Sequence, residues 1–422
     1  MKNVQKQVPS LLLLITLVGF PQISESIFTP ILPALSQAMH VSASHSQLTM
    51  SSYFVAFAVG VLFWGQYADY RGRRDAMLGG LAFYLIGNLG LYLSPGFTWL
   101  LVCRLIQAFG ASAGSVVTQT IMRESFTGVT GAKIFAKVSA AMALSPALGP
   151  LIGGGVQTVF GYQHVFSVLI MIAVVILLYA GCCLPETRPE TVKVASWRQQ
   201  SVVVSRLLHD PVVWCYGLLI SGINGILFSY YAEAPFIFET HFGFSAVQYG
   251  SLGLVLAAAS LLGALLVNWL VNYWSPMQVA LSGLGLSLVA AVGLVMTAVG
   301  NHVIGMLIGI FLAFLGLNIT LPNALNRALI GYETVMGSAS GWFSLGYYLL
   351  VSVLTYLMSL LHHGSVVTLP VYMLGVVTVM TVVYAGLYLA ACTSLILLES
   401  LGEPGLFILE LPSSFPKTCV PW

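Results

Sequence analysis

Long apolar runs follow one another along almost the entire chain, and only short polar stretches separate them. Each run is about as long as the roughly 20 residues that a helix needs to cross the hydrocarbon core of a membrane. The strands of a membrane barrel would be shorter and would alternate between apolar and polar residues, which these runs do not do. The pattern predicts an all-α integral membrane protein with twelve transmembrane helices, near residues 10–36, 47–68, 76–94, 97–121, 131–159, 164–184, 211–238, 246–272, 277–298, 303–326, 336–361 and 369–396.

The spacing of the runs divides the chain into two parts. The longest polar connection, residues 185–210, follows the sixth run and contains the segment PETRPETVKVASWRQQ. Two six-helix halves are the plan of one large class of secondary transporters. We therefore expect one half at 1–184, a cytoplasmic linker at 185–210, a second half at 211–396 and a cytoplasmic tail at 397–422.

Charged residues are rare and unevenly placed. They make up 7% of the chain, against about 25% in an ordinary soluble domain, so most of the surface has to face lipid. Of the fifteen Lys and Arg residues, fourteen fall on one side of the twelve-helix arrangement and Arg104 lies within a helix. The positive-inside rule places that side, with both termini, in the cytoplasm. No basic groove is formed, so the sequence gives no sign of a nucleic-acid partner.

The histidines show the opposite bias. Solvated loop residues are the default interpretation, and sensing of the external pH is the alternative, because histidine titrates near neutral pH. Seven of the eight fall in the predicted outer loops, namely His40, His45, His164, His241, His302, His362 and His363.

The stretch GQYADYRGRR lies between the second and third predicted helices and gathers several charges. It resembles the signature loop of the major facilitator superfamily, which sits at the same place. A plain topogenic loop would need only the arginines, so the order of glycines and acid favours the family signature. The resemblance implies a close helix contact at the first glycine and a breakable charge latch toward the other half. The matching residues are Gly65, Asp69, Gly72, Arg73 and Arg74.

Two further stretches resemble the same family. In LLVCRLIQAFGASAG, in the fourth predicted helix, Arg104 is a charge at membrane depth, and Gln107 follows three residues later on the same helix face. A charge at that depth usually faces a partner or an internal cavity, although snorkelling toward the outer surface is an alternative. In the fifth helix, SPALGPLIGG is similar to a pattern of the exporter branch, which in the family accompanies proton-coupled antiport. Its matching residues are Gly149, Pro150, Gly153 and Gly154.

The resemblance extends to about residue 395 and narrows to a branch. The segments TPILP, YYAEAPFIFETHFGFS and GLNITLPNALNRAL resemble bacterial drug-resistance exporters of the bicyclomycin/chloramphenicol type, within the twelve-helix drug:proton antiporter family. That branch often has an Asp in the first helix where this chain has Ser26, with Glu25 beside it. The resemblance implies a multi-pass protein of the bacterial inner membrane, usually a monomer, that works by alternating access.

Proton exchange needs an acid within the membrane, because burial favours the uncharged form of a carboxyl group. Two carboxylates lie well within predicted spans, Glu25 and Glu233. We expect Glu25 to carry the proton and Arg104 to modulate it, with a static Glu25–Arg104 ion pair as the alternative. Glu233, near the outer end of the seventh helix, is either a second acidic site or an interfacial residue.

A binding cavity for small amphipathic compounds requires apolar and polar side chains facing the interior. Aromatic residues of the seventh helix are candidates for its wall, although lipid contact or ordinary packing is the alternative. Two asparagines of the tenth helix could bond across helices. With Gln107, the candidate cavity residues are Phe228, Tyr230, Tyr231, Asn318 and Asn323.

Several classes of function are disfavoured. The sequence has no HExxH, GxSxG or P-loop motif, which argues against an enzyme and against ATP-driven transport within this chain. No cysteine pair has metal-ligand spacing, and neither a metal nor a cofactor is expected. The sequence therefore predicts a multidrug exporter that exchanges drug-like compounds for protons. A dedicated metabolite or siderophore exporter, an uptake symporter and a membrane sensor are the alternatives.

Overall fold

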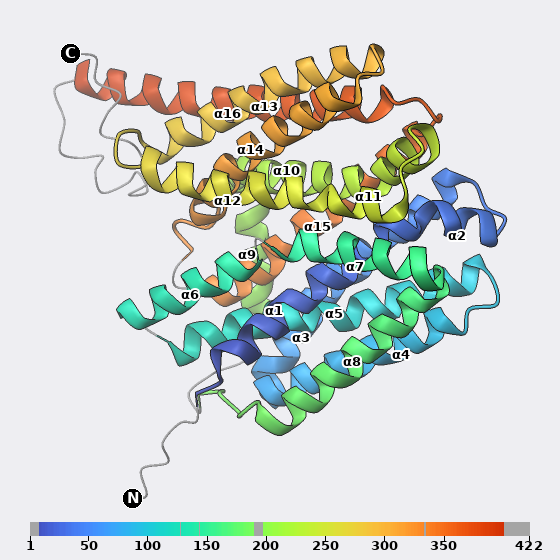
Figure 1. Ribbon diagram of the computed structural model, residues 1–422. Helices are drawn as coiled ribbons and strands as arrows, with labels where there is room; N and C mark the ends of the chain where they lie inside the picture. The colour runs from blue at the N-terminus through green and yellow to red at the C-terminus, as the bar shows by residue number, and fades with distance from the viewer. Residues whose placement is uncertain (1–7, 127, 143, 190–196, 333–334, 401–422) are drawn as a thin grey trace, which may run out of the picture. The chain divides into compact units, whose positions relative to one another are not determined.

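A computed structural model describes residues 8–126, 128–142, 144–189, 197–332 and 335–400, and the regular elements in these ranges are helices (Figure 1). Residues 401–422 of the expected tail lie outside the described ranges. The helices of the first predicted half are α1 (Leu11–Ser26), η1 (Thr29–Ile31), α2 (Leu32–Ala38), α3 (Ala43–Arg71), α4 (Arg73–Tyr92), α5 (Phe97–Ser125), α6 (Gly128–Met142), α7 (Ser145–Phe160) and α8 (Gln163–Cys183). Those that follow are α9 (Trp197–His209), α10 (Pro211–Pro235), η2 (Phe236–His241), α11 (Ala246–Ser251), α12 (Gly253–Leu270), α13 (Pro276–Val299), α14 (Val303–Arg327), α15 (Met336–Leu361) and α16 (Thr368–Ser400).

Ten helical segments of the described chain are long and apolar enough to cross a membrane. The two remaining predicted spans fall on α4, which has 20 residues, and on the pair α6 and α7, which have 15 and 16. The all-α, twelve-span prediction therefore agrees with the observed helices. The span at 131–159 is interrupted because α7 starts anew at Ser145 with a proline in its first turn, a position that needs no backbone N–H.

The first predicted span is also not one continuous helix. α1 ends at Ser26, the short 3₁₀ helix η1 follows, and α2 begins at Leu32. Pro30 and Pro33 lie in the broken region, and each lacks the backbone N–H that an uninterrupted helix would use. The Thr29 hydroxyl donates to the Ser26 carbonyl at 2.9 Å, so a side chain satisfies one of the backbone groups at the break. Glu25 therefore lies in the last turn of a helix that stops inside the span.

The helices fall into two compact units, which are described separately. The first contains Met1–Ser196, Phe228–Ala257 and Ser344–Ser365, and the second contains Trp197–Leu227, Ala258–Phe343 and Val366–Trp422. Parts of the seventh, eighth and eleventh predicted spans thus belong to the same compact unit as the first six. The division at the linker into two six-helix halves stays a prediction.

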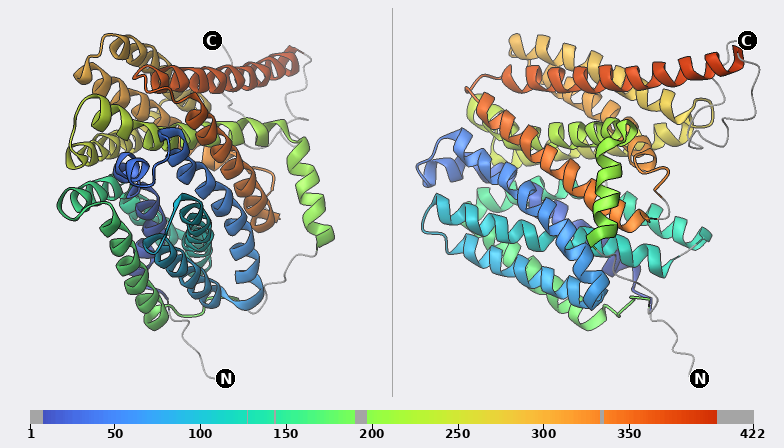
Figure 2. Two further views of the ribbon diagram at one scale, coloured as in Figure 1. Left: turned by 90° about the vertical axis from the view of Figure 1, so that its right-hand side faces the viewer. Right: turned by 180° about the vertical axis from the view of Figure 1, so that it is seen from behind.

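Within the first unit, α3, α4 and α5 pack on one another and α8 packs on α4 (Figure 1). Within the second, α13 packs on both α14 and α16. The linker contains a helix of its own, α9, which runs steeply across the direction of α10 (Figure 2). The tyrosine at position 332 joins the linker region to the α14–α15 connection, since its hydroxyl donates to Asp210 at 3.0 Å and its ring lies 4.4 Å from the Arg206 guanidinium carbon.

Candidate functional site: a buried polar cluster and a charged loop

Arg104 on α5 is completely buried, and two aromatic rings lie against its charge. The guanidinium carbon lies 4.3 Å from the ring centre of Phe28 and 4.4 Å from that of Tyr53. The Nε atom donates to the Thr49 carbonyl at 3.4 Å, and Nη1 donates to the Gln107 side-chain oxygen. Aromatic faces attract a cation most strongly where water is excluded. The arginine therefore points inward, as the sequence predicted, rather than snorkelling toward a membrane surface.

A chain of amide groups fixes the orientation of that arginine. The Gln107 side-chain nitrogen donates to the Asn88 side-chain oxygen, and Asn88 in turn donates to the Tyr84 carbonyl at 2.9 Å. Buried hydrogen-bond networks hold their members in one arrangement. The Nη2 atom of Arg104 is buried and has no hydrogen-bond partner among the described residues.

Glu25 lies near this cation but is not joined to it. Its side chain is 7% exposed, and the Arg104 charge acts on it electrostatically. Among the ion pairs between described residues, none connects these two side chains, so the direct Glu25–Arg104 pair that the sequence left open is not formed in this structure. A carboxyl group at a helix break, close to a cation yet unpaired, can gain and lose a proton without first breaking a salt bridge.

Aromatic side chains from three helices surround this region of the first unit. Phe228 on α10 lies 4.3 Å from Phe54 on α3, measured between ring centres, and Tyr348 on α15 lies 4.9 Å from Phe57. The charge of Glu25 acts on Tyr231, Tyr348, Tyr53 and Tyr347.

The predicted residues Phe228, Tyr230 and Tyr231 are all buried, which argues against a lipid-facing belt. Sequence analysis missed the aromatic residues of α3 and α15. The segment SSYFVAF in α3 carried the signal, but apolar runs alone do not tell which face points inward.

Glu233 is buried within the protein and is not an interfacial residue. Its side chain is 1% exposed and accepts a hydrogen bond from the Gln47 amide at 2.6 Å. The Nδ1 atom of His362 lies 2.8 Å from both carboxylate oxygens. The prediction that His362 lies in a solvated loop was wrong, because its ring turns inward to the carboxylate and 12% of the side chain is exposed.

The two asparagines of α14 do not bond across helices as expected. The side-chain nitrogens of Asn318 and Asn323 donate to the carbonyls of Phe314 and Ile319, each four residues earlier in the same helix, at 2.8 and 3.1 Å. Short polar side chains often satisfy themselves on their own backbone in this way. Their predicted part in a substrate cavity stays a prediction.

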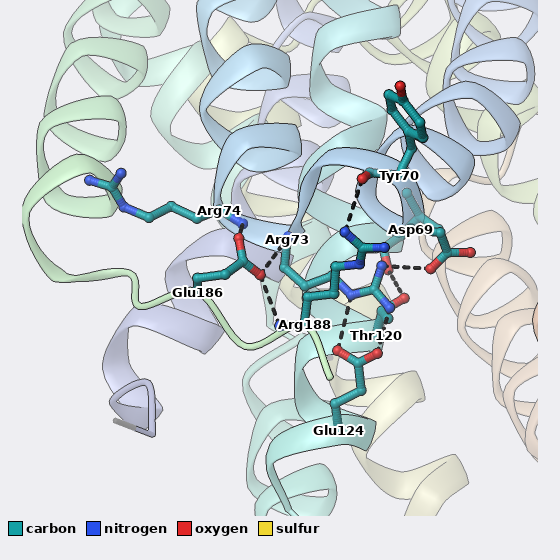
Figure 3. A network of polar contacts seen from close by, with 9 residues as sticks. Asp69, Tyr70, Arg73, Arg74, Thr120, Glu124, Glu186 and Arg188 are labelled. Atoms are coloured by element: carbon teal, nitrogen blue, oxygen red, sulfur yellow. Dashed lines mark hydrogen bonds and ion pairs between the residues drawn. The ribbon is translucent and has the colours of Figure 1, made fainter. Parts of the chain in front are cut away.

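The charged loop between α3 and α4 forms a network within the first unit (Figure 3). Arg73 is buried, and its guanidinium pairs with Asp69 at 2.6 Å and with Glu124 at the end of α5. Burial alone would lower the pKa of Arg73, but its bonds to Glu124 and Asp69 outweigh that effect and raise its pKa. The arginine therefore stays charged, with both acids bound to it. The expected contact of Asp69 with the other half stays a prediction.

Glu186, which follows α8, caps the beginning of α4. Its carboxylate accepts hydrogen bonds from the backbone N–H groups of Arg73 at 2.9 Å, Arg74 at 3.1 Å and Arg188 at 2.8 Å (Figure 3). An acid at a helix N-terminus is favourable because it satisfies free N–H groups and complements the helix dipole. Sequence analysis missed this residue, since nothing in the local pattern links positions more than a hundred residues apart.

The two glycines of the loop signature have different roles. Gly72 has φ of +117° and ψ of 159°, a backbone conformation open almost only to glycine, and a Cβ there would lie 2.9 Å from the Glu186 carboxyl carbon. At Gly65, a Cβ would stay 3.6 Å from Val116, an ordinary contact distance. The close helix approach expected at Gly65 is therefore not what requires a glycine there.

The glycine-rich helix α7 packs tightly on the break in the first span. A Cβ at Gly149 would lie 2.8 Å from the Ile27 backbone nitrogen, and one at Gly153 would lie 2.9 Å from Pro30. A Cβ at Gly154 would lie 2.8 Å from the carbonyl carbon of Ala246 on α11, and Gly250 of α11 approaches the Pro150 carbonyl. The glycines thus bring the backbones of α7, α11 and the break in the first span together. The contact at Ile27 lies two residues beyond Glu25.

No group of three or more His, Cys, Asp or Glu side chains in the described ranges could hold a metal ion. The arrangement instead combines a buried unpaired acid, a buried cation with a spare donor, and aromatic surroundings. Such a set can exchange a proton beside an apolar surface.

Comparisons with known proteins agree with this description. The chain is 32% identical over 365 residues to an uncharacterized transporter of Rickettsia bellii, which covers 84% of this chain and 90% of that protein. It is 30% identical over 356 residues to a chloramphenicol resistance protein of Pseudomonas aeruginosa, covering 83% of this chain and 84% of that protein.

A solved structure shares the fold. The crystal structure of a bacterial homologue of the human lysosomal transporter Spinster, in an inward-facing and unoccupied conformation, superposes with a TM-score of 0.70 at 15% identity, covering 90% of this chain and 95% of that one. Residues 14–356 match the sequence profile of the Major Facilitator Superfamily. The chain is therefore a membrane transporter and belongs to the Major Facilitator Superfamily.

Proposed function

We propose that this transporter exports small amphipathic compounds in exchange for protons. The observation that carries the proposal is Glu25, a buried carboxylate without an ion-pair partner among the described residues, set at the helix break beside Arg104. The similarity to a chloramphenicol resistance protein supports a drug-like substrate. The multidrug resistance protein D of Escherichia coli, 26% identical over 53% of this chain and 56% of that protein, supports the same class.

The exchange follows from competition at one buried position. A charged Glu25 far from water is costly unless a proton or a cationic group neutralises it. When Glu25 is protonated, the aromatic surroundings hold no negative charge that could attract a cationic compound. When a cationic compound is bound, it neutralises the carboxylate and disfavours the binding of a proton. Arg104 disfavours simultaneous binding of both, because it already contributes one positive charge nearby.

Alternating access then moves this position from one side of the membrane to the other. In transporters built from two halves, the halves rock about a central site. From the distribution of Lys and Arg we place both termini in the cytoplasm. The resemblance to bacterial drug-resistance exporters supports the inner membrane and a monomer. In this orientation the Asp69–Arg73–Glu124 network lies on the cytoplasmic side, where we expect Asp69 to contact the other half as a latch that must loosen in each cycle.

A vesicle experiment tests the proposal. Everted membrane vesicles that contain the protein are energised with a gradient that is acidic inside, and uptake of the lipophilic cation tetraphenylphosphonium is followed together with lumenal pH, with chloramphenicol as an uncharged second probe. We expect uptake that consumes the gradient, and we expect Glu25→Gln to reduce the proton-coupled part at least tenfold. Asp75→Asn is the matched control, since Asp75 is an exposed acid in the first turn of α4.

Proton-coupled uptake that persists in Glu25→Gln would refute Glu25 as the carrier. If chloramphenicol and a panel of lipophilic cations leave the lumenal pH unchanged while the parent protein is folded, the substrate is instead a dedicated metabolite or siderophore. Uptake that requires the opposite gradient would identify a symporter.

A further inference from the structure

A second buried acid is bound by side chains from both halves of the sequence. Glu233 on α10 accepts one hydrogen bond from Gln47 on α3 and contacts the imidazole of His362, which follows α15. Gln47 belongs to the first predicted half, and the other two residues belong to the second. All three lie in the first compact unit. This contact therefore joins the end of one span of the first predicted half to the ends of two spans of the second, and it is strained or broken if the halves rock.

The backbone around the contact is irregular. α10 ends at Pro235, two residues after Glu233, and the chain continues as the π-helix η2. Such π-helical turns are rare and frequently occur at functional sites. The side-chain oxygen of Gln47 is buried and has no hydrogen-bond partner among the described residues. If Glu233 takes up a proton, the Gln47 amide can rotate so that its oxygen accepts a hydrogen bond from the hydroxyl of the protonated acid.

Two neighbouring histidines are hydrogen-bonded away from the contact. The Nδ1 atom of His45 bonds to the Ser42 hydroxyl at 2.8 Å, and that of His363 bonds to the Leu361 carbonyl. Of the described histidines, only His362 has a bond to Glu233. The titratable or charged groups on this and the neighbouring elements are Tyr230 and Tyr231 on α10, Glu239 and His241 on η2, Tyr249 on α11, His45 on α3 and His363 after α15.

We propose that Glu233 and His362 form a second proton-binding site, separate from Glu25, that closes one end of the transporter when His362 takes up a proton. Neutral His362 donates a single N–H to the carboxylate. Protonation at Nε2 adds one positive charge and leaves the Nδ1–H bond to the ionised carboxylate in place, so a neutral imidazole beside an anion becomes an ion pair without net charge. The new charge adds Coulomb attraction to this hydrogen bond, and a buried pair is screened by salt much less than an exposed one.

This site gives the proton a role in the timing of the cycle. The predicted orientation places the end of α15 outside, so the proton arrives from the external side. Closure after its arrival follows the release of the exported compound and prepares the return of the empty, protonated carrier. The inference rests on proton exchange as the proposed function, but the contact itself can be examined without any transported compound.

Distance measurements between spin labels test the inference on the full-length protein in lipid nanodiscs. Nitroxides are placed on His45→Cys and Leu360→Cys, two exposed positions on α3 and α15, after replacement of the native cysteines. Distance distributions are recorded between pH 5.5 and pH 8, where histidine titrates. We expect the short-distance population, relative to the long one, to fall roughly tenfold as the pH rises.

The variants separate this site from its neighbours. His362→Gln keeps an amide donor but does not titrate. We expect its ratio of short-distance to long-distance populations to change less than twofold over the same pH range. Glu233→Gln removes the acid with little change of shape and should abolish the response as well. His363→Gln is the matched control, since its exposed ring does not contact Glu233, and it should respond like the parent.

Three outcomes would overturn the inference: no pH response in the parent, an unchanged response in His362→Gln, or an unchanged response in Glu233→Gln. Each variant is compared with the parent by its elution volume and melting temperature, so that misfolded protein is excluded. The vesicle assay on Glu25→Gln can fail while these distances still respond, because the distance measurement uses no gradient and no substrate. Failure of the second proton site is therefore distinguishable from failure of the proposed exchange.

Discussion

Replacing Gly72 with alanine perturbs the charged loop at its most constrained position. The backbone there has φ of +117° and ψ of 159°, which an L-residue with a Cβ rarely adopts. The new methyl group would also lie 2.9 Å from the carboxyl carbon of Glu186, closer than real Cβ contacts allow. Because Glu186 is a flexible side chain, it can move away, but only by leaving the backbone N–H groups that it caps.

The cost follows from these two effects. Holding a residue with a Cβ in this region of φ and ψ costs on the order of 1–3 kcal/mol. Loss of the carboxylate from the beginning of α4 costs about 0.5–2 kcal/mol, the usual range for a helix N-cap. We therefore expect Gly72→Ala to lower the free energy of unfolding by about 2–4 kcal/mol, mostly through α4 and the loop that precedes it.

A double-mutant cycle separates the two effects. Unfolding of the parent, Gly72→Ala, Glu186→Ala and the double variant is followed by tryptophan fluorescence in mixed lipid–detergent micelles with increasing denaturant. Glu186→Ala removes only the cap, and in its presence the methyl group at position 72 has no carboxylate to displace. The double variant should therefore be more stable than the sum of the single effects predicts, by about 1 kcal/mol.

Two results would refute this reasoning. An unfolding free energy of Gly72→Ala within about 0.5 kcal/mol of the parent would show that the backbone strain is absent. Strict additivity in the cycle would show that Gly72 and Glu186 act independently, so that the glycine does not serve to admit the cap.

Two further predictions concern α7 and the linker. Gly149→Ala places a Cβ 2.8 Å from the Ile27 backbone nitrogen and should lower the free energy of unfolding by about 1–3 kcal/mol. Gly155 lies in the same helix, and a Cβ there would have nothing within 4 Å, so Gly155→Ala should be neutral or slightly stabilising. Burial, together with the hydrogen bond to Asp210, raises the pKa of Tyr332 to about 12 from 10.0. The resulting stability is present below pH 10 and is lost as the pH rises through 12. Tyr332→Phe should therefore lose less melting temperature than the parent over that alkaline range. An equal loss in the variant and the parent would contradict the assignment.

Sequence features that depend on neighbouring residues were predictable. The spans could be located because a helix in lipid must satisfy its own backbone and present apolar side chains, a property that each stretch of about 20 residues displays by itself. The inward position of Arg104 followed from the cost of a charge at membrane depth. The composition of the loop signature likewise identified Gly72 and Arg73 as important before their contacts were known.

Features that depend on distant residues were not predictable in the same way. The sequence proposed that Glu25 and Arg104 act together but left open a direct ion pair, which the structure does not contain. It placed Glu233 without a partner, although His362, 129 residues away, contacts both of its oxygens. It gave no reason to connect Glu186 with the start of α4.

The sequence by itself determined that this chain crosses the membrane as helices, which loops carry its positive charge, and which polar residues are too deep to be accidental. Those properties are local, because burial in lipid acts on each segment separately. The tertiary structure alone decided which side chains meet and which acid stays unpaired. A contact across more than a hundred residues depends on the packing of backbones at their glycines, and no local pattern of apolar and polar positions encodes which two faces will touch.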